Sequence, residues 1–455
     1  MSAIATMTFT ETEMRKPPAP RTKMPPLFDE PTTVQNWYKH INWTQSILLI
    51  STPLAAIYGM ATTKLLTPTL IWSIIWYFFT GMGVTAGECH FYFLPNTKLL
   101  LVLGYHRHWS HRAYSATLPL KIILALTGAG SIQGSVRWWS RGHRAHHRYT
   151  DTDKDPYSAH RGVMFSHIIW MLVNRPKSRI GYADVADLDA DPVVKWQHKY
   201  YPLVALTMAF VFPTLVAGLG WGDWRGGYFY AGMVRLVFLH HATFCVNSLA
   251  HWLGETPFDD HHTPRDHFIT AFVTLGEGYH NFHHEFPQDY RNAILFYQYD
   301  PTKWFIKALS FIGLAYDLKK FPQNEVVKGQ VYMAEKKINK IKEDLNWGVP
   351  IHKLPVFTWD EFQELTKQGK QWILIEGVLY DVSKFIDEHP GGPRYIKTAI
   401  GKDMTTAFNG AVYNHSNGAR NLMSTMRIGV IRGGMEVENM KKDPIEEILD
   451  PKEYA

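Results

Sequence analysis

The sequence has only two cysteines among its 455 residues, Cys89 and Cys245. Two cysteines cannot build a disulfide framework or a cysteine-ligated zinc site, so a bound metal must use nitrogen and oxygen ligands. The chain also lacks a G-x-G-x-x-G motif after a strand, because Gly128-Ala129-Gly130 has neither the spacing nor the context. A nicotinamide dinucleotide site within the chain is therefore not expected.

Concentrated charge and an early apolar run are lacking as well. The formal net charge is +6 and is spread along the chain, without the compact basic stripe of a nucleic-acid-binding protein. Residues 1–40 carry scattered Pro, Thr and charge. They are expected to form a flexible, solvated tail and not a cleaved signal peptide.

Long apolar runs do occur further along the chain. Gln45–Thr62 and Thr69–Gly87 are separated by a short turn, and Tyr201–Leu219 and Tyr228–Asn247 flank a turn rich in Gly and Trp. Each run has about 20 residues, which is enough for a helix to cross about 30 Å of hydrocarbon. We therefore predict four transmembrane helices within residues 41–320. An even number of spans puts both termini on one side, and the Lys- and Arg-rich segments outside the short turns place that side in the cytosol.

The remaining segments have different patterns. Leu118–Val136 is apolar but is interrupted by Lys121, so a buried or interfacial helix is expected there. Residues 321–350 are rich in Lys and Glu and predict a charged helical connector. Residues 351–432 mix strand-like runs with helical segments, which predicts a small α+β domain, and residues 433–455 form a C-terminal tail.

Histidines gather in three boxes, at residues 106–111, 143–147 and 280–284. The H-x-x-H-H spacing of the second and third boxes places three imidazoles on one face of a helix, and Asn247 and His251 form another pair on one face. A single histidine is more often a surface or core residue, but three boxes together favour a metal centre. Imidazole binds both iron and zinc. The candidate ligands, enough for two metals, are His106, His111, His143, His146, His147, Asn247, His251, His280, His283 and His284.

A second pair of histidines lies in the C-terminal domain. His389 begins an H-P-G-G turn, and His415 follows within Tyr413-Asn414-His415-Ser416. Two histidines on opposite sides of a pocket can supply both axial ligands of a haem, which leaves no open site for oxygen and favours electron transfer. A redox group in the same chain favours iron over zinc in the histidine boxes.

These motifs resemble two known families. His389-Pro390-Gly391-Gly392, His415 and the preceding Y-D-V-S-K-F run at residues 380–385 resemble a cytochrome b5 domain. Residues from about 36 to 345, with the three boxes, resemble the acyl-CoA Δ9-desaturases, and the whole chain resembles their fungal members. The resemblance implies a mostly α integral membrane domain, with four transmembrane helices and a cytosolic helical cap holding a di-iron site, plus a small α+β cytochrome b5-like domain. It implies that His389 and His415 bind haem b, that Asn247 acts through a water, and that the chain lies in the endoplasmic reticulum membrane.

The resemblance also implies a reaction and a substrate site. The reaction is the O2-dependent desaturation of a saturated acyl-CoA, such as palmitoyl- or stearoyl-CoA, between C9 and C10. Because no nicotinamide site is expected here, the electrons require a separate NAD(P)H-cytochrome b5 reductase. The implied catalytic groups are the metal ligands alone. The residues that match the substrate tunnel are Gln133, Trp139, Trp170 and Thr243, and those near the CoA phosphates are Arg141 and Arg175.

Two alternatives remain open at this point. The same metal ligands could serve a membrane fatty-acid hydroxylase or a desaturase that acts at another position. The chain could also be an inactive, membrane-anchored haem electron carrier, because Glu88 to Gly104 separates Gly83–Gly87 from Tyr105-His106, which adjoin in the family pattern. We interpret this segment as a translated intron or gene-model error in preference to a source of extra ligands from Glu88, Cys89 or His90.

Overall fold

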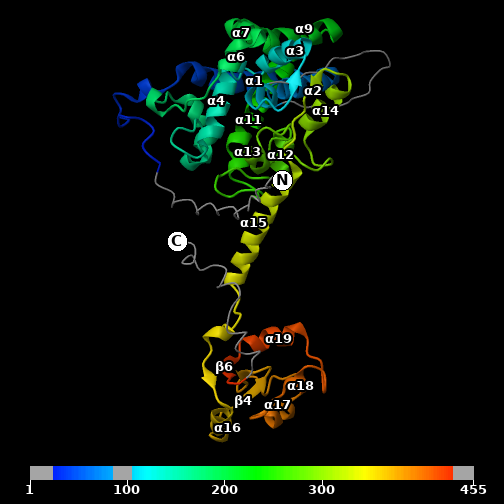
Figure 1. The fold of residues 1–455 in the computed structure, drawn as a ribbon. Coiled ribbons are helices and arrows are strands. Elements are labelled where there is room, and N and C mark those ends of the chain that lie inside the picture. The colour runs from blue at the N-terminus through cyan, green and yellow to red at the C-terminus, as the bar shows by residue number, and fades with distance from the viewer. Residues whose placement is uncertain (1–23, 86–104, 434–455) are drawn as a thin grey trace, which may run out of the picture. The chain divides into compact units, whose positions relative to one another are not determined.

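Figure 1 shows a computed structural model, which describes residues 24–85 and 105–433. The chain divides into two compact units, residues 1–336 and residues 337–455. The described part of the first unit is helical apart from one short strand pair, β1 (Ser115–Ala116) with β2 (Ala315–Tyr316). The interrupting segment from Glu88 to Gly104 lies outside the described residues.

Three helical stretches of the described chain are long and apolar enough to cross a membrane. They are α1 (Trp43–Thr62), the stretch Tyr201–Trp221 and the stretch Trp224–His251. The second stretch joins α8 (Tyr201–Leu206), η6 (Thr207–Val211) and α9 (Phe212–Trp221), and the third includes α10 (Trp224–Gly226), η7 (Gly227–Val234) and α11 (Arg235–Asn247). The remaining predicted span, the second along the chain, overlaps α2 (Thr67–Thr85), but its predicted end at Gly87 lies beyond the described residues.

Hydrogen bonds join the short turns that follow α1 and α9. Thr69 Oγ1 donates to Asp223 Oδ2 at 2.5 Å and accepts from Trp221 Nε1 at 2.8 Å. Arg225 donates to the hydroxyl oxygens of Thr62 and Thr63 at 2.8 Å. The two turns therefore lie at the same end of the helices, as expected for two helical hairpins packed side by side.

A buried arginine crosslinks the apolar helices. Arg235 is 3% exposed and donates to Thr80 Oγ1 in α2 and to the carbonyl oxygens of Gly130 and Ala209. These acceptors are a hydroxyl oxygen, the carbonyl that follows the end of α3 and a carbonyl of the π-helical turn η6, and the guanidinium replaces the water that apolar surroundings cannot supply. The side chain therefore fixes α11 against α2 and against the end of α3 (Leu118–Ala129).

The apolar segment Leu118–Val136 forms a helix, as predicted, but the helix ends before the segment does. Helix α3 ends at Ala129 and α4 (Val136–Tyr149) begins seven residues later. Between them Gly134 has a φ of +99°, a conformation that glycine adopts without strain. Ser135 then caps α4 by accepting a hydrogen bond from the Trp138 N–H. The break turns α4, which carries the second histidine box, away from the line of α3.

The rest of the first unit packs around a core beneath α3. Leu120, Leu124, Val136, Val194 and Phe305 are fully buried there. The elements that supply it or flank it are α3, α4, α6 (Ala186–Ala190), α7 (Pro192–Lys199) and α14 (Pro301–Phe311). Helices α12 (Phe268–Val273) and α13 (His280–Glu285) follow the last apolar stretch, and α13 carries the third histidine box. The Lys- and Glu-rich run forms α15 (Gln323–Glu343).

Close packing at Gly128 holds the first histidine box in place. A Cβ on Gly128 would lie 2.5 Å from Tyr105 Cε1 and 2.8 Å from the Gly83 carbonyl oxygen. The last turns of α2 and the residue before His106 therefore meet at one point on α3. This contact brings together the two described ends that flank the interrupting segment.

Gly128→Ala is expected to lower the free energy of unfolding by about 2 kcal/mol, because the added methyl overpacks this contact. Gly220→Ala is a matched control, because a Cβ on that helical glycine meets nothing within 4 Å. The control is expected to be neutral or slightly stabilising. Thermal unfolding of the purified proteins in detergent measures both, and equal melting temperatures for the two variants would contradict the packing argument.

The second unit contains a four-stranded sheet in the order β3 (Val356–Phe357), β6 (Arg427–Ile431), β5 (Val378–Asp381), β4 (Trp372–Ile375). Glu376 and Gly377, both with positive φ, form the tight turn between β4 and β5. The helices of this unit are α16 (Trp359–Lys367), α17 (Pro393–Ala399), α18 (Thr405–Phe408) and α19 (Asn417–Ser424), as labelled in Figure 1. Ile375, Val378 and Val430 pack from the sheet into its core. This is a small sheet domain with helices, as predicted.

Candidate metal and haem centres

The first histidine box lies in a π-helix, η2 (Tyr105–Ser110). The backbone N–H of His111 donates to the carbonyl of His106 at 3.2 Å, the i+5 bond of a π-turn. In an α-helix, positions five apart point about 140° from one another. The π-turn brings His111 back over His106, so both imidazoles face the same point.

The second and third boxes lie on ordinary α-helical turns. Helix α4 carries His143, His146 and His147, and α13 carries the third box. The start of α13 is held by Asp266, whose Oδ1 accepts from the backbone N–H groups of Asn281 and Phe282 at 2.8 and 3.2 Å. His251 ends a short 3-10 turn, η8 (Leu249–His251).

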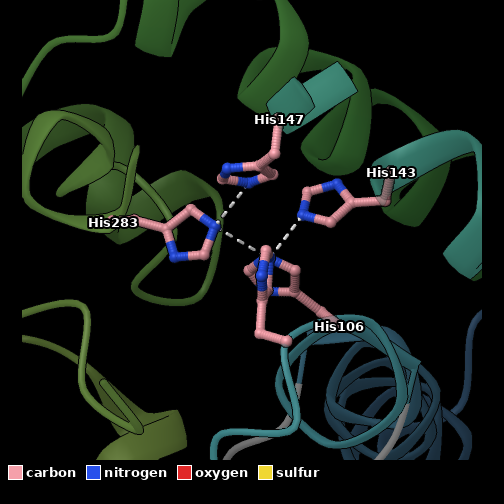
Figure 2. Close-up of side chains that lie close together, drawn as sticks. His106, His143, His147 and His283 are labelled. Atoms are coloured by element: carbon pink, nitrogen blue, oxygen red, sulfur yellow. Dashed lines mark hydrogen bonds between the residues drawn. The ribbon is translucent and has the colours of Figure 1, made fainter. Parts of the chain in front are cut away.

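Five histidines converge in a first cluster, four of which are labelled in Figure 2. His283 Nε2 lies 3.0 Å from His106 Nε2 and 3.0 Å from His147 Nε2, and His111 Nε2 lies 2.8 Å from His143 Nε2. The possible ligand atoms of the cluster all lie within 4.8 Å of one another. We call this set, His106, His111, His143, His147 and His283, the five-histidine cluster.

The other four box histidines form a second cluster. His284 Nε2 lies 3.2 Å from His146 Nε2 and 3.1 Å from His280 Nε2, and His280 Nε2 lies 3.1 Å from His251 Nε2. We call this set, His146, His251, His280 and His284, the four-histidine cluster. All nine histidines predicted as ligands thus lie in two adjoining groups.

Bound metal ions account for these short nitrogen–nitrogen distances better than hydrogen bonds do. A ring nitrogen carries one proton or one lone pair, so His283 Nε2 cannot form good hydrogen bonds with two other Nε2 atoms at once. A cation at the centre satisfies every lone pair. Two nitrogens bound about 2.1 Å from one metal at a right angle lie about 3.0 Å apart, which is the separation found here. The donor set is entirely imidazole, and iron accepts it.

The charge state of the clusters suits metal binding. Burial, together with repulsion from neighbouring imidazoles, holds the pKa values well below their usual range for His111, His143, His147, His280, His283 and His284. These rings are therefore neutral near pH 7 and keep a lone pair for a metal. Burial alone would raise the pKa of the nearby Glu277, but His106 and Arg107 lower it to about 2.

A cavity of about 300 Å³ lies beside the five-histidine cluster. His143 forms part of its wall, and Trp139, also in the wall, stacks on the His143 ring with centroids 5.0 Å apart. All six residues predicted to bind substrate line this cavity: Gln133, Trp139, Arg141, Trp170, Arg175 and Thr243. Gln133 Nε2 donates to Thr243 Oγ1 at 2.9 Å, which links α11 to the segment before α4.

The cationic side chains that line the cavity differ in their exposure and in their hydrogen bonds. Arg141 and Lys154 are exposed, whereas Arg175 donates to the carbonyl oxygens of Asp155, Asp153 and Arg179 at 2.6–2.7 Å. Arg175 therefore already holds a loop, and Lys154 is a second exposed cation that the sequence interpretation missed. The signal for Lys154 was its place in the charged stretch after the second box.

Asn247 lies on the same cavity wall, at the end of α11. The α-helix ends at Asn247 and His251 lies in the following 3-10 turn, so the two residues do not share one α-helical face as predicted. The role of Asn247 as a ligand through water stays a prediction. A further group outside both clusters, Asp259, Asp260 and His261, is half-buried.

His389 and His415 face each other in the second unit. Their ring centroids lie 6.5 Å apart at an angle of 38°. Two imidazoles bound at about 2.0 Å on opposite sides of one iron have centroids about 6.3 Å apart, so the pair fits a haem. His389 Nδ1 lies 3.2 Å from the Gly392 carbonyl and His415 Nδ1 lies 3.0 Å from the Phe408 carbonyl. These contacts leave both Nε2 atoms for the metal.

Comparisons with known proteins agree with both units. A family model described as fatty acid desaturase matches residues 89–317, and one described as cytochrome b5-like heme/steroid binding domain matches residues 358–432. The chain is 53% identical over 413 residues to a "Probable acyl-CoA desaturase" of Schizosaccharomyces pombe, covering 91% of this chain and 82% of that protein. It is 46% identical over 406 residues to "Acyl-CoA desaturase 1" of Saccharomyces cerevisiae, with 89% and 76% covered. A human "Stearoyl-CoA desaturase" is 36% identical over 287 residues, with 61% and 74% covered.

The fold and the sites define a histidine-rich desaturase joined to a haem-binding electron-transfer domain. The chain belongs to the fatty acid desaturase family, among the acyl-CoA desaturases that carry a cytochrome b5-like domain. The predicted resemblance is confirmed, and so is its assignment to the oxidoreductases of fatty acyl desaturation. The hydroxylase and the inactive electron carrier are not favoured by these relatives. The family implies a metal centre, its second domain implies haem, and the apolar helices suggest a membrane protein.

Proposed function

We propose that this chain is a di-iron stearoyl-CoA 9-desaturase that uses O2 to introduce a double bond between C9 and C10 of palmitoyl- or stearoyl-CoA. The observation that carries the proposal is the convergence of nine histidines into two clusters beside a cavity. Two irons held there would supply the oxygen chemistry that breaks unactivated C–H bonds, which side-chain acids and bases cannot do. The balanced reaction takes O2, two electrons, two protons and two substrate hydrogens to two waters.

The chain's own residues bind and orient the substrate. The exposed Arg141 and Lys154 are placed to attract the CoA phosphates at the cavity mouth. The acyl tail then lies along Trp139 and Trp170, with the Gln133–Thr243 pair fixing its course. Holding the chain in one position relative to the histidine clusters determines which two carbons react and excludes water from them.

The second unit would supply electrons, and the apolar helices would hold the chain in a membrane. His389 and His415 would hold haem b, and a separate NAD(P)H-cytochrome b5 reductase would reduce it, because the sequence has no nicotinamide fingerprint. We propose four membrane spans, with α2 as the second, in the endoplasmic reticulum membrane with both termini in the cytosol. Asn247 is proposed to contribute through a water.

The test is gas chromatography of total fatty acids from desaturase-deficient yeast that expresses the chain. Palmitoleate and oleate are expected to reappear. A second form lacking residues 88–104 is tested in parallel, because Gly83 and Tyr105 already meet at Gly128 and the shortened chain is expected to fold. Its comparison with the full chain separates an effect of the interrupting segment from an effect of the metal site.

The products discriminate between the candidate activities. Hydroxy fatty acids would favour a hydroxylase, and double bonds at another position would favour a different regiospecificity. If neither form changes the fatty acids although both are expressed and bind haem, the proposal of a Δ9-desaturase fails.

A further inference from the structure

We propose that two buried carboxylates, Glu277 and Asp155, are positioning residues that each control metal binding at one cluster. Glu277 serves the five-histidine cluster through His106, and Asp155 serves the four-histidine cluster through His146. The inference rests on the proposed di-iron function, and it assigns a separate outer partner to each metal.

Asp155 contacts the four-histidine cluster from outside. Its Oδ1 lies 2.8 Å from His146 Nδ1, and its side chain is fully buried. The backbone N–H groups of Asp151 and Tyr157 donate to its two carboxylate oxygens at 3.0 and 3.2 Å. These bonds fix the carboxylate on the side of His146 that faces away from the cluster.

Glu277 occupies the matching place at the five-histidine cluster. Its Oε2 lies 3.1 Å from His106 Nδ1, with side-chain exposures of 2% and 4%. The distance allows an electrostatic contact, but His106 Nδ1 has no hydrogen bond to a described residue. Asn292 Nδ2 donates to the same Oε2 at 2.6 Å, and Arg107 donates to Oε1 at 3.1 Å.

The two carboxylates are unequal in their surroundings. Arg107 also donates to both carboxylate oxygens of Asp300 at 3.1 and 2.9 Å, so Glu277 belongs to a buried network with one cation. In the described part of the chain, no cation pairs with the Asp155 carboxylate: Arg175 donates to the backbone carbonyl of Asp155 instead. Asp155 is therefore held mainly by backbone N–H groups, and its charge is less compensated.

The two carboxylates act on their metals in partly different ways. By accepting the Nδ1 proton of His146, Asp155 selects the tautomer whose Nε2 lone pair points into the cluster, and it orients the ring. Both carboxylates supply negative charge beside a site whose predicted ligands are all neutral, which stabilises a dication. Outer-sphere partners of this kind commonly change metal affinity by about 10–100-fold.

The other outer contacts are weaker or neutral. His251 Nδ1 meets Thr263 Oγ1 at 2.8 Å, and that hydroxyl donates to Asp151 Oδ1 at 2.6 Å. His143 Nδ1 meets the Tyr157 hydroxyl at 3.4 Å. Among the described residues, Glu277 and Asp155 are the carboxylates that directly contact a cluster histidine.

The experiment measures non-haem iron per chain in Glu277→Gln and Asp155→Asn, purified after equal exposure to a chelator. The amides keep the shape and lose the charge. Each variant is expected to lose iron at about 10–100-fold lower chelator concentration than the wild type, and from one site only. Haem per chain in the same samples reports the folding of the second unit, and thermal unfolding in detergent reports the folding of the first unit. Asp189→Asn, which alters a half-buried pair with Arg137 outside both clusters, is the matched control and is expected to behave as wild type.

Double variants identify the site that each carboxylate serves. Adding Glu277→Gln to His111→Ala, which already disables the five-histidine cluster, is expected to cause no further loss of iron. Adding Glu277→Gln to His284→Ala is expected to remove the remaining iron. Asp155→Asn is expected to cause no further loss of iron when added to His284→Ala, and to remove the remaining iron when added to His111→Ala. Glu277→Asp and Asp155→Glu, which restore the charge, are expected to recover part of the affinity.

The outcomes separate this inference from the proposed function. A wild-type chain that binds no non-haem iron would overturn the di-iron proposal itself. A wild type with two irons, together with Glu277→Gln and Asp155→Asn that retain both irons as tightly, would overturn the inference alone. Loss of both irons from either single variant with haem retained would also overturn it, because that result indicates a general structural role.

Discussion

Replacing His284 with alanine is expected to reduce fatty acid desaturation to background and to lower the non-haem iron content by about half. His284 Nε2 faces two other ring nitrogens of its cluster, His146 Nε2 at 3.2 Å and His280 Nε2 at 3.1 Å. Its removal leaves three of four imidazoles and an open coordination position. Iron analysis of the purified chain and gas chromatography of yeast lipids measure the two effects.

His241→Ala is the control for this variant. His241 is exposed and pairs with His167 at 3.0 Å, outside both clusters. The His241→Ala chain is expected to keep the iron content and the desaturase activity of the wild type. An active His284→Ala chain with unchanged iron would exclude the four-histidine cluster as a metal site.

His389→Ala is expected to abolish haem absorbance and NADH-driven desaturation while leaving the non-haem iron in place. His389 and His415 face each other with ring centroids 6.5 Å apart, and a haem held from one side only binds far more weakly. The histidine clusters belong to the other compact unit of the chain. Absorbance spectra, iron analysis and turnover with added reductase give the three measurements.

The same variant shows whether the haem is needed only for electron delivery. Supplying a separate cytochrome b5 is expected to restore part of the activity of His389→Ala. His352→Ala, in the short turn η9 (Ile351–Lys353) of the same unit, is the control and is expected to keep its haem. Full NADH-driven activity of His389→Ala without added cytochrome would show that the haem is not on the electron route.

The α-helical period of the sequence correctly predicted that the second and third histidine boxes lie in helices. The H-x-x-H-H spacing correctly placed three imidazoles of α4, and three of α13, on neighbouring positions. It could not divide them between metals. His143 and His147 enter one cluster while His146 enters the other, because each helix lies between the two sites and presents adjacent faces to them.

The contacts of Glu277 and Asp155 with the clusters, and the break between α3 and α4, could not be predicted from the sequence for a different reason. Glu277 and His106 are far apart in the chain, and no local spacing rule connects them. Asp155 is close to its box, but a carboxylate in a charged stretch is most often solvated. The helix expected over Leu118–Val136 ends early, at Ala129, because hydropathy does not register the positive φ of Ile132 and Gly134.

The π-turn at His106–His111 has a consequence for how the first histidine box can vary. A π-turn is equivalent to an α-helix with one residue inserted. Removing one residue between the two histidines would therefore restore an α-helical turn with the imidazoles four positions apart, still on one face. A box with four residues between its histidines on a π-turn and a box with three on an α-turn can therefore direct two imidazoles to the same point. A search for homologous metal sites should allow the count of intervening residues to change while the direction of the two rings is kept.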